Sequence, residues 1–358
     1  MNIKGNIKYI VAGSIVFLII YLFAAPLPLK SELYFEPVWT QDISEAKSWP
    51  EGLDAPLDLE PFILGEKFGY FTPSGEILFS RQMEGNASVS RAAWAHSDMK
   101  SKTTSIASPD GTPAATIALQ GNVFLMDDRR YLFLPGGGGV SQLDETGKPL
   151  WTQDHIAPLT AFNSSRSGTI MGYGDGKLVC VNQTGEILFS FYPGGSSHQI
   201  ILSAAVSEDG KKVVCLSGIK EQRILVIDIR ANQTKIIQHR YLKGDLRRNS
   251  FASFESAGEW AFVETSDGLG IIDCKKNEIH LIPLAGKIVS AGFNPGESLF
   301  LILSRDEEYF TLAMVERPDH LLASTRFKAD NAFLIQNGGD AYLGADSNIS
   351  KIAIRGLK

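Results

Sequence analysis

The same six residues, GEILFS, occur at Gly75–Ser80 and again at Gly185–Ser190, each time after a small hydroxyl residue. Chance repetition of a six-residue word is improbable in a chain of 358 residues. The word therefore indicates an internal structural repeat, and no other feature of the sequence restricts the fold as strongly.

Weaker copies of the word set the period of the repeat. The segment LDETGKPLW contains one such copy, and its Gly147 lies 72 residues after Gly75 and 38 before Gly185. This spacing corresponds to a unit of about 36–38 residues and predicts a further copy near residue 112, where SPDGTPAATIA stands. Similar turn-then-strand signals follow at longer spacing as ANQTKIIQH, CKKNEIHLI and RPDHLLAST.

The segments between these turns also repeat. Residues 159–181, 202–218, 251–268 and 289–306 each contain a short strand with small residues, a turn with Gly, and an apolar run. No sustained helical period occurs after residue 60, so the pattern predicts antiparallel sheet. Four short strands per roughly 40 residues predict an all-β fold, a β-propeller of four-stranded antiparallel blades. The small residues at strand starts are expected on the innermost strands, where space is limited: Ala161, Ala204, Ala205, Ala252 and Ala291.

The ends of the chain decide the number of blades. The C-terminal residues supply three strands, so an N-terminal strand should complete the last blade and cover its open edge. Residues 37–43, PVWTQDI, resemble PLWTQDHI at 149–156. If Val38–Asp42 closes the ring there are eight blades, which we prefer; if Ile77–Arg81 closes it there are seven. The eight-blade ring requires residues 44–60 to provide a first inner strand.

The repeats resemble known propeller families. LDETGKPLW resembles the repeat of quinoprotein-like (PQQ-like) propellers, in which an outer-strand tryptophan docks between blades, and VNQTGEILF and FTPSGEILF are similar with Phe in place of Trp. AAVSEDGKKVVCLSG is instead similar to WD40-type repeats. The resemblance covers about residues 36–358 and implies a propeller fold. Quinoprotein dehydrogenases of this fold carry a vicinal cysteine pair, which is missing here, so the resemblance implies a non-enzymatic type.

The N-terminal part predicts a membrane anchor. Residues 9–29 contain no charge, and about 20 apolar residues suffice to span a bilayer. Lys4 and Lys8 precede this segment, so the positive-inside rule places residues 1–8 in the cytoplasm. We predict an uncleaved signal-anchor helix at 9–29 rather than a cleaved signal peptide, whose apolar core is usually about 7–15 residues. An acidic, proline-containing linker (30–60) and the propeller domain (61–358) would then lie in the periplasm, tethered to the bacterial inner membrane.

Residue patterns that carry chemistry are scarce. The run Gly136–Gly139 lacks the Lys-Ser/Thr and the helix of a phosphate-binding loop, and we predict a wide turn. The six histidines are dispersed without the spacing of metal ligands. Cys180, Cys215 and Cys274 are odd in number and far apart, which predicts buried free thiols. We therefore predict no catalytic residue, no cofactor and no metal site.

Two functional hypotheses remain. A net charge of −6 gives no electrostatic reason to expect nucleic acid as a partner. The preferred hypothesis is a membrane-anchored propeller that scaffolds unidentified envelope or membrane proteins; it resembles the propeller lipoproteins of the outer-membrane-protein assembly machinery, but has no cysteine for lipid attachment. Its candidate binding surfaces are Ser217–Arg223, Lys243–Asn249 and Gly136–Gly139. The alternative is a propeller enzyme or small-ligand sensor, which would need carboxylates or histidines converging on the central channel.

Overall fold

The computed structural model describes residues 33–52, 58–83, 85–97, 103–126, 128–230, 233–255, 257–293, 299–337 and 339–356. The chain divides into two units. In the smaller unit, which contains the described residues 33–36 and 354–356, Arg355 Nε donates a hydrogen bond to Glu36 Oε2 at 2.9 Å. The larger unit is residues 37–353. The anchor predicted at 9–29 lies outside the described residues, among which there is no helix long and apolar enough to cross a bilayer.

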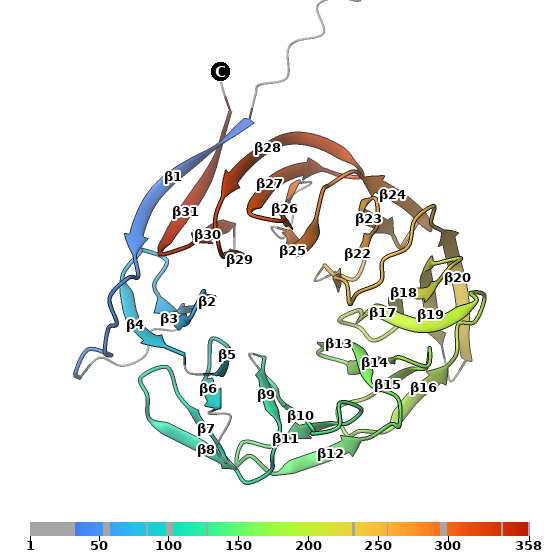
Figure 1. Ribbon diagram of the computed structural model, residues 1–358, viewed down its shortest axis with the longest axis horizontal. Helices are drawn as coiled ribbons and strands as arrows, with labels where there is room; N and C mark the ends of the chain where they lie inside the picture. The colour runs from blue at the N-terminus through green and yellow to red at the C-terminus, as the bar shows by residue number, and fades with distance from the viewer. Residues whose placement is uncertain are drawn as a thin grey trace, which may run out of the picture. The chain divides into compact units, whose positions relative to one another are not determined.

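The larger unit is an eight-bladed β-propeller. Among the described residues there are seven four-stranded sheets and one three-stranded sheet, with antiparallel pairing throughout the registered strand pairs. Within residues 37–353 these sheets follow one another in a ring (Figure 1). The predicted fold class is confirmed, and so is the preferred count of eight blades over seven.

Blades are numbered here in chain order. Blade 1 consists of β2 (Glu60–Leu64), β3 (Lys67–Phe71) and β4 (Ile77–Gln82). Blade 2 consists of β5 (Asn86–Val89), β6 (Trp94–Ser97), β7 (Thr104–Ala107) and β8 (Pro113–Ile117). Blade 3 consists of β9 (Asn122–Leu125), β10 (Arg130–Phe133), β11 (Val140–Leu143) and β12 (Pro149–Gln153). Blade 4 consists of β13 (Leu159–Ser165), β14 (Gly168–Tyr173), β15 (Leu178–Val181) and β16 (Ile187–Phe191).

The second half of the ring continues in the same way. Blade 5 consists of β17 (His198–Val206), β18 (Lys212–Ile219), β19 (Arg223–Arg230) and β20 (Gln233–Tyr241). Blade 6 consists of β21 (Ala252–Phe254), β22 (Trp260–Thr265), β23 (Gly268–Asp273) and β24 (Glu278–Ile282). Blade 7 consists of β25 (Lys287–Phe293), β26 (Leu299–Asp306), β27 (Tyr309–Glu316) and β28 (His320–Lys328). Blade 8 consists of β29 (Ala332–Asn337), β30 (Asp340–Ala345), β31 (Asn348–Gly356) and β1 (Leu33–Asp42).

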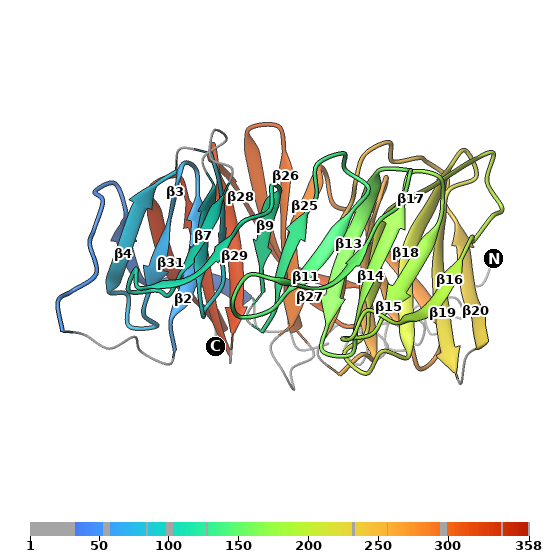
Figure 2. The same cartoon turned by 90° about the horizontal axis from the view of Figure 1, so that it is seen from below.

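The strands run between two faces of the ring (Figure 2). One face holds the loops that connect successive blades and the turns between the second and third strands of each blade. We call it the upper face. These two kinds of connection are hydrogen-bonded to each other: the N–H of Leu159 donates to Gly137 O at 2.7 Å, and that of Leu242 to Gln222 O at 2.9 Å. The lower face holds the remaining turns. The alanines expected on innermost strands lie on β13, β17, β21 and β25, as predicted.

The hydrophobic cores lie between blades, because each sheet has apolar side chains on both faces. Ile170 and Cys180 of blade 4, for example, share one core with Val213 and Cys215 of blade 5. The three cysteines are buried and free, as predicted. Burial raises the pKa of the Cys180 and Cys215 thiols to about 12, so both are protonated at neutral pH.

The repeated word marks the turn between the third and fourth strands of a blade. In blade 4, Asn182 Oδ1 accepts hydrogen bonds from the Thr184 N–H (3.0 Å), the Thr184 hydroxyl (2.8 Å) and the Glu186 N–H (2.9 Å). The N–H of Gly185 donates to Asn182 O at 3.1 Å. Asp144 has the same role in blade 3. The repeat is therefore a side-chain-capped turn, and β16 after it is an outermost strand, as predicted.

The glycine of this turn touches the preceding blade. Gly185 has φ +83° and Gly75 has φ +98°. A Cβ atom on Gly185 would lie 2.5 Å from Trp151 Cβ, and one on Gly75 would lie 2.8 Å from Trp39 Cδ2. The turn thus needs glycine for its left-handed backbone and for the close approach of a tryptophan. At these two joints the outer-strand tryptophan lies between blades, as the resemblance implied.

Removing the cap of the turn in blade 4 should destabilise the ring slightly. We expect Asn182→Ala to lower the free energy of unfolding by about 1 kcal/mol, since each of the lost hydrogen bonds contributes modestly in a partly exposed turn. Urea unfolding followed by circular dichroism measures the change. The exposed Ser190→Ala, four residues after Glu186, is the matched control. Equal stability of N182A and the wild-type protein would contradict the role given to this side chain.

The N-terminal strand closes the ring as predicted. β1 is hydrogen-bonded to β31 in the order β1-β31-β30-β29, and the hydroxyls of Thr40 and Ser350 lie 2.8 Å apart. A strand of ten residues therefore occupies part of the predicted linker at 30–60.

The expectation that residues 44–60 provide a first inner strand is wrong for the described residues. Glu60, at the start of β2, is fully buried and accepts hydrogen bonds from Asn337 (2.5 Å), at the end of β29, and from Arg91 (3.2 Å), in the turn after β5. β2 therefore runs opposite to β29 and β5, its innermost neighbours. Blade 1 contains the equivalents of the second, third and fourth strands, which explains why KFGYFTPSGEILFS at 67–80 resembles KLVCVNQTGEILFS at 177–190.

Candidate functional site

The three loops singled out from the sequence lie on the upper face. Gly136–Gly139 joins β10 to β11, Ser217–Arg223 spans the turn from β18 to β19, and Lys243–Asn249 links blade 5 to blade 6. The sequence alone did not show that they would share one face. They share this face because two of them are turns between a second and a third strand, and the third is a loop between successive blades.

A buried glutamine joins two of these loops. Gln222 has no exposed surface. Its amide nitrogen donates to Gly218 O (2.8 Å) and Leu246 O (3.0 Å), and its amide oxygen accepts from the Leu246 N–H at 3.0 Å. The N–H of Lys220 donates to Asp245 Oδ2 at 3.1 Å. Lys243–Asn249 is thus held in place by side chains rather than by a strand.

We expect Gln222→Leu to loosen the loop at 243–249 without unfolding the ring. The substitution leaves both backbone groups of Leu246 without their partner, at a cost of about 1–3 kcal/mol. Amide hydrogen exchange around Leu246 should become at least tenfold faster, while exchange in β18 and β19 stays slow. The exposed Gln199→Leu in the same blade is the control. Unchanged exchange in Q222L would show that the glutamine does not hold the loop.

The glycine run forms the predicted wide turn, and each glycine has a physical reason. Gly136 and Gly137 have φ values of +95° and +77°. A Cβ atom on Gly138 would lie 2.0 Å from His155 O, and one on Gly139 would lie 2.9 Å from a Leu134 methyl carbon. The turn lines a pocket of about 310 Å³ together with Asn249 of the loop Lys243–Asn249. The lining residues are Phe133, Gly137, Gly139, Leu159, Thr160, Ala161, Phe162 and Asn249.

Three exposed apolar side chains on the upper face were missed by the sequence reasoning. Ile156 is fully exposed, and Tyr192 and Tyr241 are about half exposed; we call these three residues the upper-face patch. They come from the loops and strand ends of blades 3, 4 and 5. Ile156 in QDHIAP and Tyr192 in FYPGGSS are apolar residues next to turn-forming residues, which could have indicated exposed positions. The sequence does not show, however, which loop side chains lie exposed.

Polar contacts fix the loops that carry this patch. Arg223, which is buried, donates to Pro193 O (2.8 Å) and Gly194 O (2.7 Å). Its guanidinium carbon lies 5.6 Å from the centre of the Tyr241 ring. A guanidinium against an aromatic face is attractive and orients the ring. The patch is therefore presented by a loop of defined geometry.

A histidine–carboxylate pair orders the loop that carries Ile156. His155 Nε2 lies 2.8 Å from Asp175 Oδ2, and the His155 ring contacts the Tyr173 ring edge-on at 4.5 Å. Desolvation alone would raise the pKa of Asp175, but the hydrogen bonds from His155 and the Lys177 N–H lower it below its ordinary value. Burial, with nearby Asp154 and Asp175, raises the pKa of Tyr173 to about 12. Asp175 is therefore ionised and the tyrosine neutral at physiological pH.

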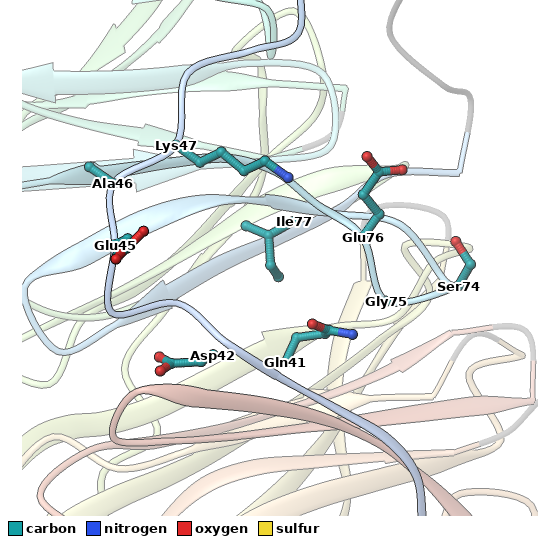
Figure 3. Close-up of a pocket in the computed structure, with 9 residues that line it drawn as sticks. All are labelled: Gln41, Asp42, Glu45, Ala46, Lys47, Ser74, Gly75, Glu76 and Ile77. Carbon is teal, nitrogen blue, oxygen red and sulfur yellow. The ribbon is translucent and has the colours of Figure 1, made fainter.

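A second, larger pocket lies where the ring closes, at the joint of blades 8 and 1. Its volume is about 610 Å³, and we call it the joint groove. Figure 3 shows the chain of Gln41–Lys47 on one side and the turn Ser74–Ile77 on the other. The lining residues are Gln41, Asp42, Glu45, Ala46, Lys47, Ser74, Gly75, Glu76 and Ile77.

The part of the chain that the structure describes contains no group of three His, Cys, Asp or Glu side chains arranged to hold a metal ion. The six histidines predicted to be dispersed are found on separate elements: His155 pairs with Asp175, His280 with Asp319 and His320 with Glu316. Each of these three histidines therefore contacts a carboxylate, and the three pairs are separate from one another.

Comparison with known proteins places these features in context. A family model described as "beta-propeller protein" matches residues 1–358. An uncharacterized protein of Treponema pallidum (strain Nichols) is 35% identical over 364 residues, covering 100% of this chain and 97% of that protein. The crystal structure of BamB from Moraxella catarrhalis is similar with a TM-score of 0.63 and 10% identity, covering 89% of this chain and 99% of that one. At this identity the likeness to BamB shows a shared fold.

Proposed function

The chain belongs to this family of β-propeller proteins, and from that premise we propose that it is a non-catalytic scaffold of the bacterial cell envelope, which binds other envelope proteins through its upper face. The proposal includes an uncleaved anchor at residues 9–29 in the inner membrane, with the propeller in the periplasm. The charge-free length of that segment supports the anchor. The fold shared with BamB supports a ring that works as a binding platform.

The observation that carries the proposal is the upper-face patch. Exposed apolar side chains on a soluble surface mark interaction sites when they gather on one face. Tyrosine and arginine are enriched at protein interfaces, because a large side chain with a polar end can be buried without losing its hydrogen bonds. Tyr192 and Tyr241 have this character, and Ile156 adds a fully exposed aliphatic side chain. Arg223 holds two of the loop carbonyls beside them.

The test replaces the patch and compares it with equally exposed apolar residues elsewhere. The variant Ile156→Ser/Tyr192→Ser/Tyr241→Ser removes the patch, and the control Leu150→Ser/Ile187→Ser removes two outer-strand side chains of similar exposure. Each tagged full-length protein is chemically cross-linked in the native envelope, purified and analysed by mass spectrometry. We expect the patch variant to recover at least tenfold less of a reproducible envelope partner, since a tyrosine at an interface hot spot contributes about 2 kcal/mol or more. Equal recovery from both variants would place the interface elsewhere, and no partner with any variant would contradict the scaffold function.

A further inference from the structure

Two joints of the ring have nearly the same sequence but differ in structure. Residues 37–42 read PVWTQD and face a TPSGEI turn, whereas residues 149–154 read PLWTQD and face an NQTGEI turn. Between blades 3 and 4, Gln153 Nε2 donates a hydrogen bond to Gly185 O at 3.2 Å and so connects the two blades. At the joint of blades 8 and 1, no hydrogen bond links the corresponding Gln41 and Gly75, and both line the joint groove instead.

The path of the chain after each tryptophan strand explains the difference. After Asp154 the chain enters the next blade as its innermost strand, β13. After Asp42 the chain instead runs along the outermost strand of blade 1. Lys47 forms a β-bridge with Ser80 of β4, in which both nitrogen-to-oxygen distances are 2.9 Å. Lys67 Nζ holds the segment by donating to the carbonyls of Ile43 (2.9 Å) and Ser44. This segment is the second wall of the groove, and the joint of blades 3 and 4 has no counterpart of it.

The groove lies beside a sheet edge and is acidic. Within the described residues, the outer edge of β4 makes backbone pairs only through Ser80 with Lys47. Asp42, Glu45 and Glu76 give the groove three carboxylates against the one ammonium of Lys47. Hydrogen bonds from the Ser44 hydroxyl and N–H lower the pKa of Asp42, so this carboxylate is ionised at neutral pH. An open strand edge offers backbone hydrogen bonds to an extended chain, and the charge selects a basic one.

We propose that the joint groove docks an extended basic segment of a partner protein, with an arginine side chain reaching the carboxylates. A guanidinium suits the site because it has five donors and no acceptor, whereas the groove offers three carboxylates. The proposal rests on the joint alone and is independent of the upper-face patch. It assigns the ring a second contact, on its outer rim.

A peptide probe tests the proposal with the full-length protein in detergent. The probe is a fluorescein-labelled decapeptide of alternating Arg and Thr, and its uncharged analogue has citrulline in place of Arg. Binding is followed by fluorescence anisotropy at 0.15 M salt, where charges farther apart than about 8 Å are screened. We expect saturable binding of the arginine peptide, at least tenfold tighter than that of the citrulline peptide.

Matched variants separate the groove from general acidity. Glu45→Gln/Glu76→Gln should weaken binding at least tenfold. The control Glu145→Gln/Glu186→Gln removes two exposed turn carboxylates, and Glu186 holds the same place in GEILFS as Glu76; it should change affinity less than twofold. Three results overturn the proposal: no saturable binding, equal affinity for both peptides, or equal weakening by both double variants. Loss of binding in the upper-face variant would also overturn it, since the peptide would then bind the other site.

Discussion

Replacing Glu264 with alanine is expected to lower the free energy of unfolding by about 3–5 kcal/mol, because two backbone N–H groups lose their hydrogen-bond acceptor, at about 1–3 kcal/mol each, together with the bond from Arg248. Glu264 is the last residue but one of β22 and has no exposed surface. Its carboxylate accepts hydrogen bonds from Arg248 Nη2 (2.7 Å), the Phe251 N–H (2.9 Å) and the Ile288 N–H (2.9 Å). Alanine leaves two backbone donors without partners, one of them at the start of blade 7. The side chain therefore joins blade 6 to both the loop before it and the blade after it.

The measurement is urea unfolding of both proteins, followed by circular dichroism. Glu259→Ala in the same blade is the control: it breaks the ion pair with Lys275 at 2.5 Å, but the Glu259 and Lys275 side chains are 41% and 65% exposed. Exposed pairs contribute only about 0–1 kcal/mol. The assignment fails if E264A and E259A lose the same stability, because burial would then not distinguish the two carboxylates.

Gly185→Val should be the second severe change, with a loss of about 3–5 kcal/mol from backbone strain and overpacking together. A β-branched residue is poorly tolerated at φ +83°. Its Cβ would also lie 2.5 Å from Trp151 Cβ, which is backbone-proximal and cannot swing aside. The joint of blades 3 and 4 must then open.

A second glycine separates the two causes. Gly111 has φ +88° in an equivalent turn of blade 2, but a Cβ atom there would meet nothing within 4 Å. Gly111→Val should therefore lose only the strain, about 1–2 kcal/mol. Thermal unfolding of G185V and G111V measures the difference. If the two variants melt together, contact with the tryptophan has no energetic role, and the glycine serves the turn alone.

Much of the ring could be predicted because its signals are local. The capped turn requires a side-chain oxygen, a hydroxyl residue and a glycine within four positions, so it leaves a similar sequence in each blade that uses it. The closing strand was recognisable for the same reason: Trp39 has to approach Gly75 as Trp151 approaches Gly185, and both strands therefore read P-x-W-T-Q-D.

Features that depend on distant contacts could not be predicted. The direction of β2 is evident only from the hydrogen bond of Glu60, at its start, with Asn337 at the end of β29, 277 residues away in the sequence. The joint groove could not be predicted because Gln41 and Gln153 occupy nearly the same motif. The two joints differ in the route of the chain after Asp42, which leaves a groove at one joint, whereas a hydrogen bond from Gln153 connects the blades at the other. The upper-face patch depends on loops from three blades, whose exposure no single segment determines.

The pairing of β1 with β31 has a consequence for biosynthesis. β1 is the first strand of the domain to leave the ribosome, and its partner is the last. Blade 8 cannot assemble until β31 has been synthesised, whereas the strands of blades 2 to 7 are contiguous in the sequence. A contact between segments so far apart in the sequence forms slowly. Until it forms, β1 has to remain unpaired and must not pair with a strand of a neighbouring molecule. A prematurely terminated product would lack this junction, so any binding partner that recognises it distinguishes finished molecules from incomplete ones.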